Sequence, residues 1–258
     1  MRFVNTILRM LRVRRLLFLC AAAPMLAAEI SLCQAHGAEM SVKVRYRQNA
    51  VLTISGPIVY GDAKKFEDLA VMWGKRGFWI GYVRLWSPGG SVSEALQIGR
   101  QIRMMKAATG APRLMDDGIT RRCVRKTPVD MEVRDIYWNT RTKQGDSGCD
   151  CASACFLIWV AGVGRFGNVL GVHRPSFDAK YFAGLTPTEA SQVYERMSGE
   201  VSDYLREMDV AQPIIDRMFA FSSSEMDYLS ALDIRLMNNG SKALSELRDA
   251  RCGSAPDG

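Results

Sequence analysis

The sequence predicts a single α/β domain with a mostly parallel sheet, spanning residues 39–258 behind an N-terminal signal segment at residues 1–38. Three observations lead to this prediction. Apolar, strand-like segments alternate with amphipathic helical segments through the first half of the chain. A pair of glycines stands between one strand and the helix that follows it. The first residues have the composition of an export signal and not that of a packed domain.

The N-terminal segment has the two parts of a secretory signal. Five arginines lie among residues 2–15, and an apolar stretch rich in leucine and alanine follows at 16–28. Small residues favour cleavage after Ala28 or near Gly37-Ala38. We therefore expect export of the protein, and an uncleaved N-terminal anchor that associates with a membrane is the alternative.

The positive charge of the chain lies mostly in this segment. The whole sequence has 34 basic and 27 acidic residues, a net charge of +7, but residues 1–37 hold five arginines and a single acid, Glu29. The remaining residues therefore have a net charge of +3. The basic composition gives no reason to expect a nucleic-acid partner.

Five of the seven cysteines lie outside the signal segment: Cys123, Cys149, Cys151, Cys155 and Cys252. Cysteines of an exported protein are expected to form disulfides, and an odd number leaves at least one without a partner in the chain. We expect a disulfide from Cys123 to Cys149 or Cys151. The spacing of Cys149, Cys151 and Cys155 differs from that of zinc knuckles, so we expect no metal.

The first elements of the domain follow from apolar periodicity. Strands are predicted at 41–47 and 50–54, a helix at 62–73, a strand at 78–86 and a helix at 91–105. The second helix begins with a capping box formed by Ser91 and Glu94. The glycines at 89 and 90, just before it, let a ligand come close to the backbone N–H groups of the turn.

Ser153 lies between two alanines at the start of an apolar run that continues to Gly162. This pattern places the serine at the beginning of a buried helix. The free N–H groups of a helix N-terminus favour negative charge, which suits a nucleophile and an oxyanion. The alternative is that the Ser153 side chain only caps a core helix, a common role of serine.

The chain has two histidines, and His36 lies in the signal segment. A serine that is activated by a histidine must therefore use His173. This residue follows the apolar stretch 169–172, which predicts a buried strand, and an imidazole at a strand end is well placed to reach a serine at a helix start. The order of the glycine pair, Ser153 and His173 along the chain strengthens the prediction of a catalytic site.

Four short motifs resemble the successive motifs of the proteolytic subunit of the Clp protease. They read Ile-Ser-Gly-Pro-Ile at 54–58, Ser-Pro-Gly-Gly at 87–90, Cys-Ala-Ser-Ala at 151–154 and Val-His-Arg-Pro at 172–175. The resemblance covers about residues 50–235 and implies the spiral of β-β-α units that defines the ClpP/crotonase superfamily. It also implies that Ser153 is the nucleophile, that His173 is the general base, and that Gly90 and Ala154 supply the oxyanion-hole N–H groups. The chain closely resembles an exported, periplasmic bacterial branch of that superfamily.

The sequence departs from this family in two places. The stretch 110–150 is much longer than the family's link, is basic at 121–126 and contains Tyr137 and Trp138. It is interpreted either as a disulfide-pinned flap beside the site or as a solvated insertion. The family's catalytic aspartate aligns with Ser222, so the nearby acids become candidates: Asp216, Glu225 and Asp227. We choose Asp227 among them.

These features predict an exported serine peptidase that hydrolyses peptides or unfolded chains without a cofactor. The chain contains no P-loop, and an exported protein meets no ATP, so no ATPase partner is expected. A helix predicted from Pro187 to about Met208 has an apolar stripe of the kind that forms core or oligomer contacts, and the resemblance implies a homo-oligomer. A mechanism that pairs the serine with Lys180 or Lys242 is less favoured, because neither lysine lies in a recognisable motif.

Two alternatives belong to other functional classes. The protein is a catalytically inactive scaffold that binds peptides or a membrane partner if the displaced acid has abolished catalysis. A crotonase-type enzyme acting on acyl thioesters would share the fold and the paired-amide oxyanion hole. The Ser153 and His173 pair argues against that alternative, as does export away from coenzyme A.

Overall fold

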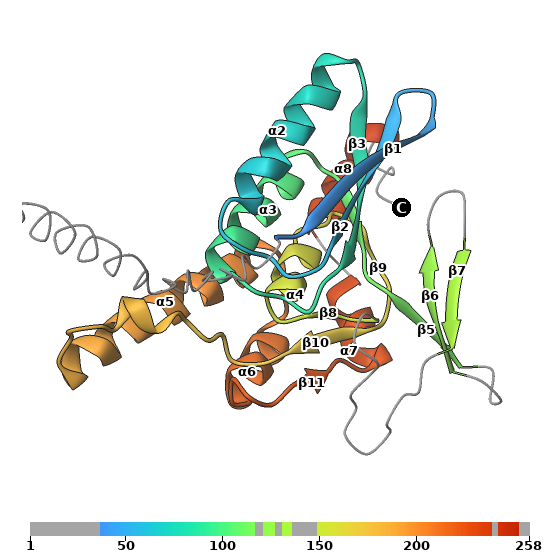
Figure 1. Cartoon of the computed structure of the whole chain (residues 1–258). Helices are drawn as coiled ribbons and strands as arrows, with labels where there is room; N and C mark the ends of the chain where they lie inside the picture. The colour runs from blue at the N-terminus through green and yellow to red at the C-terminus, as the bar shows by residue number, and fades with distance from the viewer. Residues whose placement is uncertain (1–36, 117–120, 127–130, 136–148, 239–241, 253–258) are drawn as a thin grey trace, which may run out of the picture. The chain divides into compact units, whose positions relative to one another are not determined.

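The structure is a computed structural model that describes residues 37–116, 121–126, 131–135, 149–238 and 242–252 (Figure 1). By its internal contacts the chain divides into two units, Met1–Gln34 and Ala35–Gly258. Every helix and strand described below belongs to the second unit. The predicted signal segment lies almost wholly outside the described residues, so the boundary between residues 38 and 39 remains a prediction.

The main sheet has five strands in the order β1-β2-β3-β4-β9. Their bounds are Glu39–Tyr46 for β1, Asn49–Ser55 for β2, Trp79–Trp86 for β3, Ala108–Gly110 for β4 and Arg165–Phe166 for β9. The strands β1 and β2 form an antiparallel hairpin, and all later pairs are parallel. The predicted α/β class with a mostly parallel sheet is confirmed.

A second sheet has the order β11-β10-β8. Its strands are Cys151–Ala152 (β8), Leu170–Val172 (β10) and Asp227–Tyr228 (β11). The β8 and β10 pair is parallel, whereas β10 and β11 run antiparallel. Two isolated bridges, Ile58 with Gly90 and Ser87 with Cys151, connect the chain beyond β3 to both sheets. The segment 87–90 is therefore held along both of its edges, and Figure 1 shows the small sheet beside the end of β3.

The helices of the described residues follow the strands. Their bounds are Asp62–Lys75 (α2), Val92–Met104 (α3), Ala154–Trp159 (α4), Pro187–Glu207 (α5), Gln212–Ala220 (α6), Ala231–Asn238 (α7) and Lys242–Cys252 (α8), with a short 3-10 helix at Ala179–Tyr181. The helices α2 and α3 contact each other and lie side by side along the main sheet (Figure 1). None of the helices in the described ranges is long and apolar enough to cross a membrane.

Helix α4 is at the centre of the core. All six of its residues are buried, because its sequence is apolar on every side. The Tyr204 hydroxyl of α5 donates to the Leu157 carbonyl at 2.7 Å, and the Trp159 Nε1–H donates to the Phe166 carbonyl at 2.9 Å. Burial of each large apolar side chain contributes about 1.5–3 kcal/mol. The helix that follows Ser153 is thus a rigid base for that residue.

The helix starts follow the predictions, with one difference. At α5 the Thr186 side chain and the Glu189 carboxylate form a reciprocal capping box, with proline in the first turn. At α3, Ser91 accepts a hydrogen bond from the Glu94 N–H, but the Glu94 carboxylate does not bond back. That carboxylate instead accepts the Ala63 N–H of α2 at 2.7 Å. The predicted capping box is therefore only half formed, because the buried glutamate is used between two helices.

The long segment between β4 and β8 contains structure that the sequence interpretation missed. The strands Arg113–Asp116 (β5), Arg121–Lys126 (β6) and Met131–Asp135 (β7) form a three-stranded antiparallel sheet. The sequence interpretation places the basic run of β6 in a flap or a solvated loop, although charged residues are tolerated in strands with solvated faces. Tyr137 and Trp138 lie outside the described residues.

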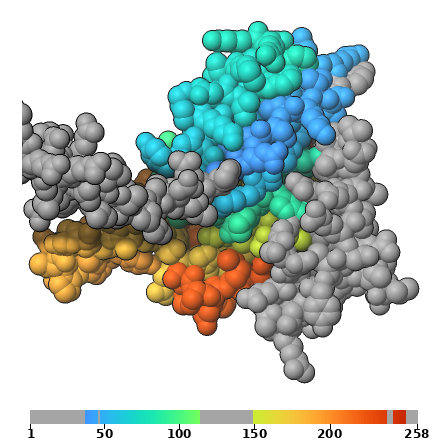
Figure 2. Space-filling model, in the orientation of Figure 1, coloured from blue at the N-terminus to red at the C-terminus, as the bar shows by residue number. Residues whose placement is uncertain are grey.

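The surface shown in Figure 2 is continuous over the β1–β2 hairpin and α2, which are coloured blue to cyan. Single apolar side chains are exposed on these elements, among them Val44 and Val71. Scattered exposed apolar residues are normal on a soluble domain and mark no site by themselves. The candidate site residues from the sequence lie instead at the end of β3 and at the small sheet.

Candidate active site

Ser153 occupies a strained turn between β8 and α4. Its backbone has φ 56° and ψ −124°, a conformation that residues other than glycine rarely adopt. Strained serines at strand-to-helix turns expose the hydroxyl at the edge of a sheet in one large class of hydrolases. The Ser153 side chain makes no capping hydrogen bond to the helix. The interpretation of Ser153 as a simple helix cap is therefore wrong.

Covalent and hydrogen bonds hold this turn in place. The Ser153 N–H donates to the Gly171 carbonyl at 3.0 Å, and the Ser153 carbonyl accepts from the Phe156 N–H at 2.9 Å. A disulfide joins Cys151 to Cys155, whose Cα atoms are 5.1 Å apart. The serine is thus the middle residue of a five-residue turn that is closed at both ends.

The Cys151–Cys155 disulfide corrects the cysteine prediction. The suggested bond from Cys123 to Cys151 is wrong, because the turn brings Cys155 within the usual disulfide distance of Cys151. Cys149 is also disulfide-bonded. The pairing of Cys123 with Cys149 therefore remains a prediction.

The segment Ser87–Gly90 packs directly against the serine turn. A Cβ atom on Gly89 would lie 2.6 Å from the Ser153 Cβ and 3.0 Å from the Ala154 nitrogen, so no side chain fits there. Gly89 also has φ +104°, which strongly favours glycine. The Ala152 N–H donates to the Ser87 carbonyl at 3.1 Å and fixes the register of the two segments.

Two backbone amides beside Ser153 have no partner within the described residues: those of Gly90 and Ala154. The groups on either side of Gly90 are used, because the Ile58 N–H donates to the Gly89 carbonyl and the Ser91 N–H donates to the Ile58 carbonyl, each at 2.8 Å. Ala154 is the first residue of α4, where the N–H has no intrahelical partner. Two unengaged donors next to a nucleophile are what an oxyanion hole requires.

His173 follows β10 at the same edge of the small sheet. In the parallel β8 and β10 pair, Ala152 lies opposite Gly171, so Ser153 and His173 leave the carboxyl ends of neighbouring strands. His173 is buried, and its burial is the main cause that lowers the pKa of the imidazole, with the Arg174 backbone acting in the opposite direction. The lowered pKa favours the neutral imidazole, which is the form that a general base needs.

No hydrogen bond from an acid to the His173 imidazole is seen among the described residues. The buried Nδ1 atom of His173 has no hydrogen-bond partner among the described residues. Asp227 lies in β11 opposite Val172 and is buried, but its Oδ2 accepts a hydrogen bond from the Arg217 Nε–H. The same guanidinium also donates to the Asp233 carboxylate at 2.8 Å. Asp227, the acid chosen from the sequence, therefore lies on the strand next to His173, but its carboxylate is hydrogen-bonded to Arg217.

The other acids near this position are at the surface. Asp216 accepts a hydrogen bond from the Gln212 side chain at 2.7 Å, and Glu225 is exposed. Ser222, which aligns with the family's aspartate, is not buried, and its hydroxyl lies 3.0 Å from the Ser224 hydroxyl. None of these three residues is buried, so none is placed like a triad acid.

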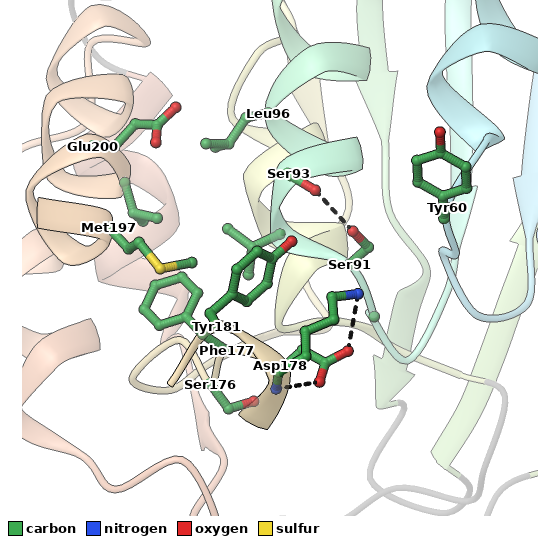
Figure 3. Close-up of a pocket in the computed structure, with 14 residues that line it drawn as sticks. Tyr60, Ser91, Ser93, Leu96, Ser176, Phe177, Asp178, Tyr181, Met197 and Glu200 are labelled. Atoms are coloured by element: carbon green, nitrogen blue, oxygen red, sulfur yellow. Dashed lines mark hydrogen bonds and ion pairs between the residues drawn. The ribbon is translucent and has the colours of Figure 1, made fainter. Parts of the chain in front are cut away.

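A cavity of about 430 Å³ opens beside Gly90 (Figure 3). Its walls come from the start of α3, from the segment 176–181 and from α5. Apolar side chains line much of it, namely Val92, Leu96, Phe177, Tyr181, Met197 and Val201. An ion pair between Asp178 and Lys180 at 3.1 Å lies at the cavity, as do the hydroxyls of Ser91 and Ser93.

The sequence interpretation does not find these cavity residues. The apolar spacing assigns Met197 only to a core or oligomer stripe of its helix, and it gives Phe177 and Asp178 no role. The only signal for them in the sequence is their position just after His173, which has meaning only when the cavity is known. Lys180, which the sequence offered as an alternative base, is exposed and forms an ion pair with Asp178. The hydrogen bond to Asp178 raises the pKa of Lys180 and therefore keeps the lysine charged.

These features together define an α/β protein with a strained serine at a strand-to-helix turn and, beside it, two backbone amides that have no partner within the described part of the chain. No protein-family model matches the sequence, and no curated protein is significantly similar to it. Among solved structures, the chain is similar to ClpP1 from Listeria monocytogenes, with a TM-score of 0.44 at 13% identity, over 73% of this chain and 86% of that chain. An asparagine-to-aspartate mutant of the same protein is similar with a TM-score of 0.43 at 14% identity, over the same shares of the two chains.

Proposed function

We propose that the chain is an exported serine peptidase that hydrolyses peptides or unfolded polypeptides in the periplasm without an ATPase. Ser153 is its nucleophile, His173 its general base, and the Gly90 and Ala154 N–H groups its oxyanion hole. The protein is proposed to work as a homo-oligomer, in keeping with the motif resemblance. Membrane association through the N-terminal segment is the alternative that applies if this segment is not cleaved.

The observation that carries the proposal is the geometry of the serine turn. A strained Ser153, closed in by a disulfide and by Gly89, stands between two amides that donate to no group within the described part of the chain. Strain of this kind costs about 1–3 kcal/mol and is found mostly where function requires it. A purely structural turn at this position would gain stability by using those amides.

The chemistry follows from these groups. The Ser153 hydroxyl attacks the carbonyl carbon of a peptide bond while His173 accepts its proton. The carbonyl oxygen becomes an oxyanion, and the Gly90 and Ala154 N–H groups stabilise it. His173 then donates the proton to the leaving amine, and a water molecule activated by the same imidazole releases the acyl group. The apolar cavity beside Gly90 supports the choice of a peptide substrate, because it offers contacts for a side chain near the bond that is cleaved.

A second candidate function is favoured by one specific observation. Asp227 is bonded to Arg217, and His173 Nδ1 has no partner among the described residues. An imidazole without an acid is a weaker base, and loss of the acid lowers the rate by about 10⁴ in serine proteases. An inactive scaffold that binds peptides in the cavity would have this arrangement.

Labelling with a fluorophosphonate probe distinguishes the two candidates. We expect the purified protein with intact disulfides to be labelled. Labelling should disappear in Ser153→Ala, and the labelling rate should fall by about 10²–10⁴-fold in His173→Ala. Ser222→Ala, which changes a hydroxyl that is not buried, is the matched control and should be labelled like the wild type. A folded wild type that resists the probe would support the scaffold instead.

A further inference from the structure

Asp62 is a buried carboxylate without a positively charged partner among the described residues. Only 4% of the residue is exposed, and it is the first residue of α2. Its Oδ2 atom accepts two backbone hydrogen bonds, from the Ala38 N–H at 3.0 Å and from the Val59 N–H at 2.8 Å. A buried charge is costly unless an opposite charge compensates it. The surroundings of Asp62 therefore favour a cation that the described residues do not supply.

The backbone of Ala38 is fixed at this carboxylate. Ala38 is fully buried, and its carbonyl accepts a hydrogen bond from the Lys65 side chain at 2.7 Å. Gly37, just before it, is tightly enclosed, since a Cβ there would lie 2.7 Å from Val59 Cγ2 and 3.0 Å from Asp62 Oδ1. The second oxygen of the carboxylate thus lies close to Gly37, which occupies the space next to the Ala38 nitrogen.

The Gly37–Ala38 bond lies at one of the two places where small residues favour cleavage of the signal segment, the other being after Ala28. Ala35 and Gly37 stand three residues and one residue before the cut, the two places where signal peptidases require small side chains. Hydrolysis of this bond consumes one water, leaves a carboxylate on Gly37 and gives Ala38 an amino group that is protonated near neutral pH. Because Ala38 is buried in the folded domain, the cut must precede folding, as it does when a signal is removed during export.

We propose that export processing cuts the chain between Gly37 and Ala38, and that the new α-ammonium group of Ala38 forms a buried ion pair with Asp62. The ammonium nitrogen takes the place of the amide nitrogen that already lies 3.0 Å from Oδ2. Removal of Gly37 also leaves space beside the Oδ1 atom of Asp62, next to which Gly37 lies. The ion pair neutralises the buried charge of Asp62 and fixes the first residue of the mature domain.

This ion pair is connected to the oxyanion hole by a short path. The Asp62 Oδ2 atom that accepts the Ala38 N–H also accepts the Val59 N–H. The residue before Val59, Ile58, is hydrogen-bonded to Gly89 and Ser91, the two neighbours of Gly90. A Cβ on Gly90 would lie only 2.1 Å from the Ile58 carbonyl oxygen, so a shift of Ile58 moves Gly90. Processing at Ala38 therefore stabilises the position of an oxyanion donor, a consequence that rests on the proposed function. The ion pair itself does not depend on that function.

The test compares three N-termini of the otherwise identical domain: Ala38 with a free amino group, Ala38 preceded by Gly37, and acetylated Ala38. The glycine extension is a matched control, because the described structure already accommodates Gly37. Each form is made with Asp62 and with Asp62→Asn, and both the denaturant midpoint of unfolding and the rate of fluorophosphonate labelling are measured. The mass of the protein secreted from cells gives the natural first residue.

We expect the secreted protein to begin at Ala38. The free form should unfold at a higher denaturant concentration than the extended and acetylated forms and should be labelled about tenfold faster, and this advantage should vanish in the Asp62→Asn variants. Equal midpoints of the three Asp62 forms, or a natural first residue other than Ala38, would overturn the proposal. If no form is labelled, the peptidase proposal fails while the midpoints still decide the ion pair. If Asp62→Asn does not fold, the acetylated form decides the effect of the charge.

Discussion

The two halves of the candidate site differ in how firmly they are built. The serine half is constrained by a disulfide, by hydrogen bonds at both ends of the turn and by the close packing of Gly89. The histidine half has a buried imidazole whose Nδ1 has no partner among the described residues, and an acid that is bonded to Arg217. The structure thus prepares the stabilisation of an oxyanion more completely than it prepares proton transfer.

This difference bears on the rate that the site can reach. One oxyanion donor contributes about 10²–10³ to the rate, and a general base contributes about 10²–10⁴. An acid that orients the base adds up to about 10⁴. A site with an oxyanion hole and a general base but without the orienting acid would be labelled by a reactive probe and would cleave peptides slowly. The following changes test the two halves separately, in order of decreasing expected effect on activity.

The largest effect is expected in the serine half, from Gly90→Ala. The new Cβ would meet the Ile58 carbonyl oxygen at 2.1 Å and displace the Gly90 N–H. We expect the fluorophosphonate labelling rate to fall by at least about 10²-fold. Gly56→Ala is the control, because Gly56 also has a positive φ, of +88°, but no atom lies within 4 Å of the added Cβ. Equal losses in both variants would contradict the role of Gly90.

The histidine half is tested by the pH dependence of labelling. Burial lowers the pKa of His173, so the neutral, active imidazole persists below the ordinary histidine pKa of about 6.5. The labelling rate should rise with pH and reach half its maximum below that value. Because the folded state binds the proton less tightly than the unfolded state does, His173 also makes the protein lose stability as the pH falls below about 6.5.

Rates and denaturant midpoints measured from about pH 4.5 to 8 check both statements. His173→Gln is the control for stability, because it should remove the histidine contribution to the acid destabilisation. A labelling midpoint clearly above the ordinary histidine pKa would contradict the burial argument.

Removal of the disulfide tests how much the serine turn depends on it. In Cys151→Ala with Cys155→Ala the short loop is open, and the chain-entropy model gives a loss of about 2 kcal/mol in the free energy of unfolding. We expect labelling to fall several-fold, because the strained Ser153 backbone loses one of its constraints. Reduction of the wild type should lower both quantities at least as far, because it also opens the disulfide of Cys149. Unchanged labelling in a less stable variant would show that the hydrogen bonds and Gly89 suffice to hold the turn.

The smallest effect on activity is expected from Asp227→Asn. If the acid serves Arg217 and not His173, labelling should change by less than about threefold, whereas the free energy of unfolding should fall by about 2 kcal/mol through loss of a charged hydrogen bond in a buried place. Asp233→Asn removes the other partner of the same guanidinium and is the matched control. A loss of labelling near 10⁴ in Asp227→Asn alone would identify Asp227 as the triad acid.

The sequence predicted the parts of the molecule that depend on local patterns. The glycine pair, the helix starts at Asp62 and Pro187, and the serine at the head of an apolar run each leave a signal within a few residues. The Arg217 and Asp227 pair leaves no such signal, because it joins α6 to β11 and depends on tertiary packing. The pairing of Cys151 with Cys155 was missed because the conformation of the turn, and not the spacing, brings the two sulfurs together. The strands β5 to β7 were missed because their basic residues resemble those of a solvated loop.

The small sheet has a consequence for the order of events in folding. Its ladder joins β8 to β10 and β10 to β11, and the Ser87–Cys151 bridge connects it to the end of β3, so every partner is remote in the sequence. Contacts between remote segments form late, because the chain must first close long loops. We therefore expect the Ser153 turn and the segment 87–90 to come together late in folding. If the chain is exported unfolded, as proposed, we expect Ser153 to stay unreactive until the domain has folded.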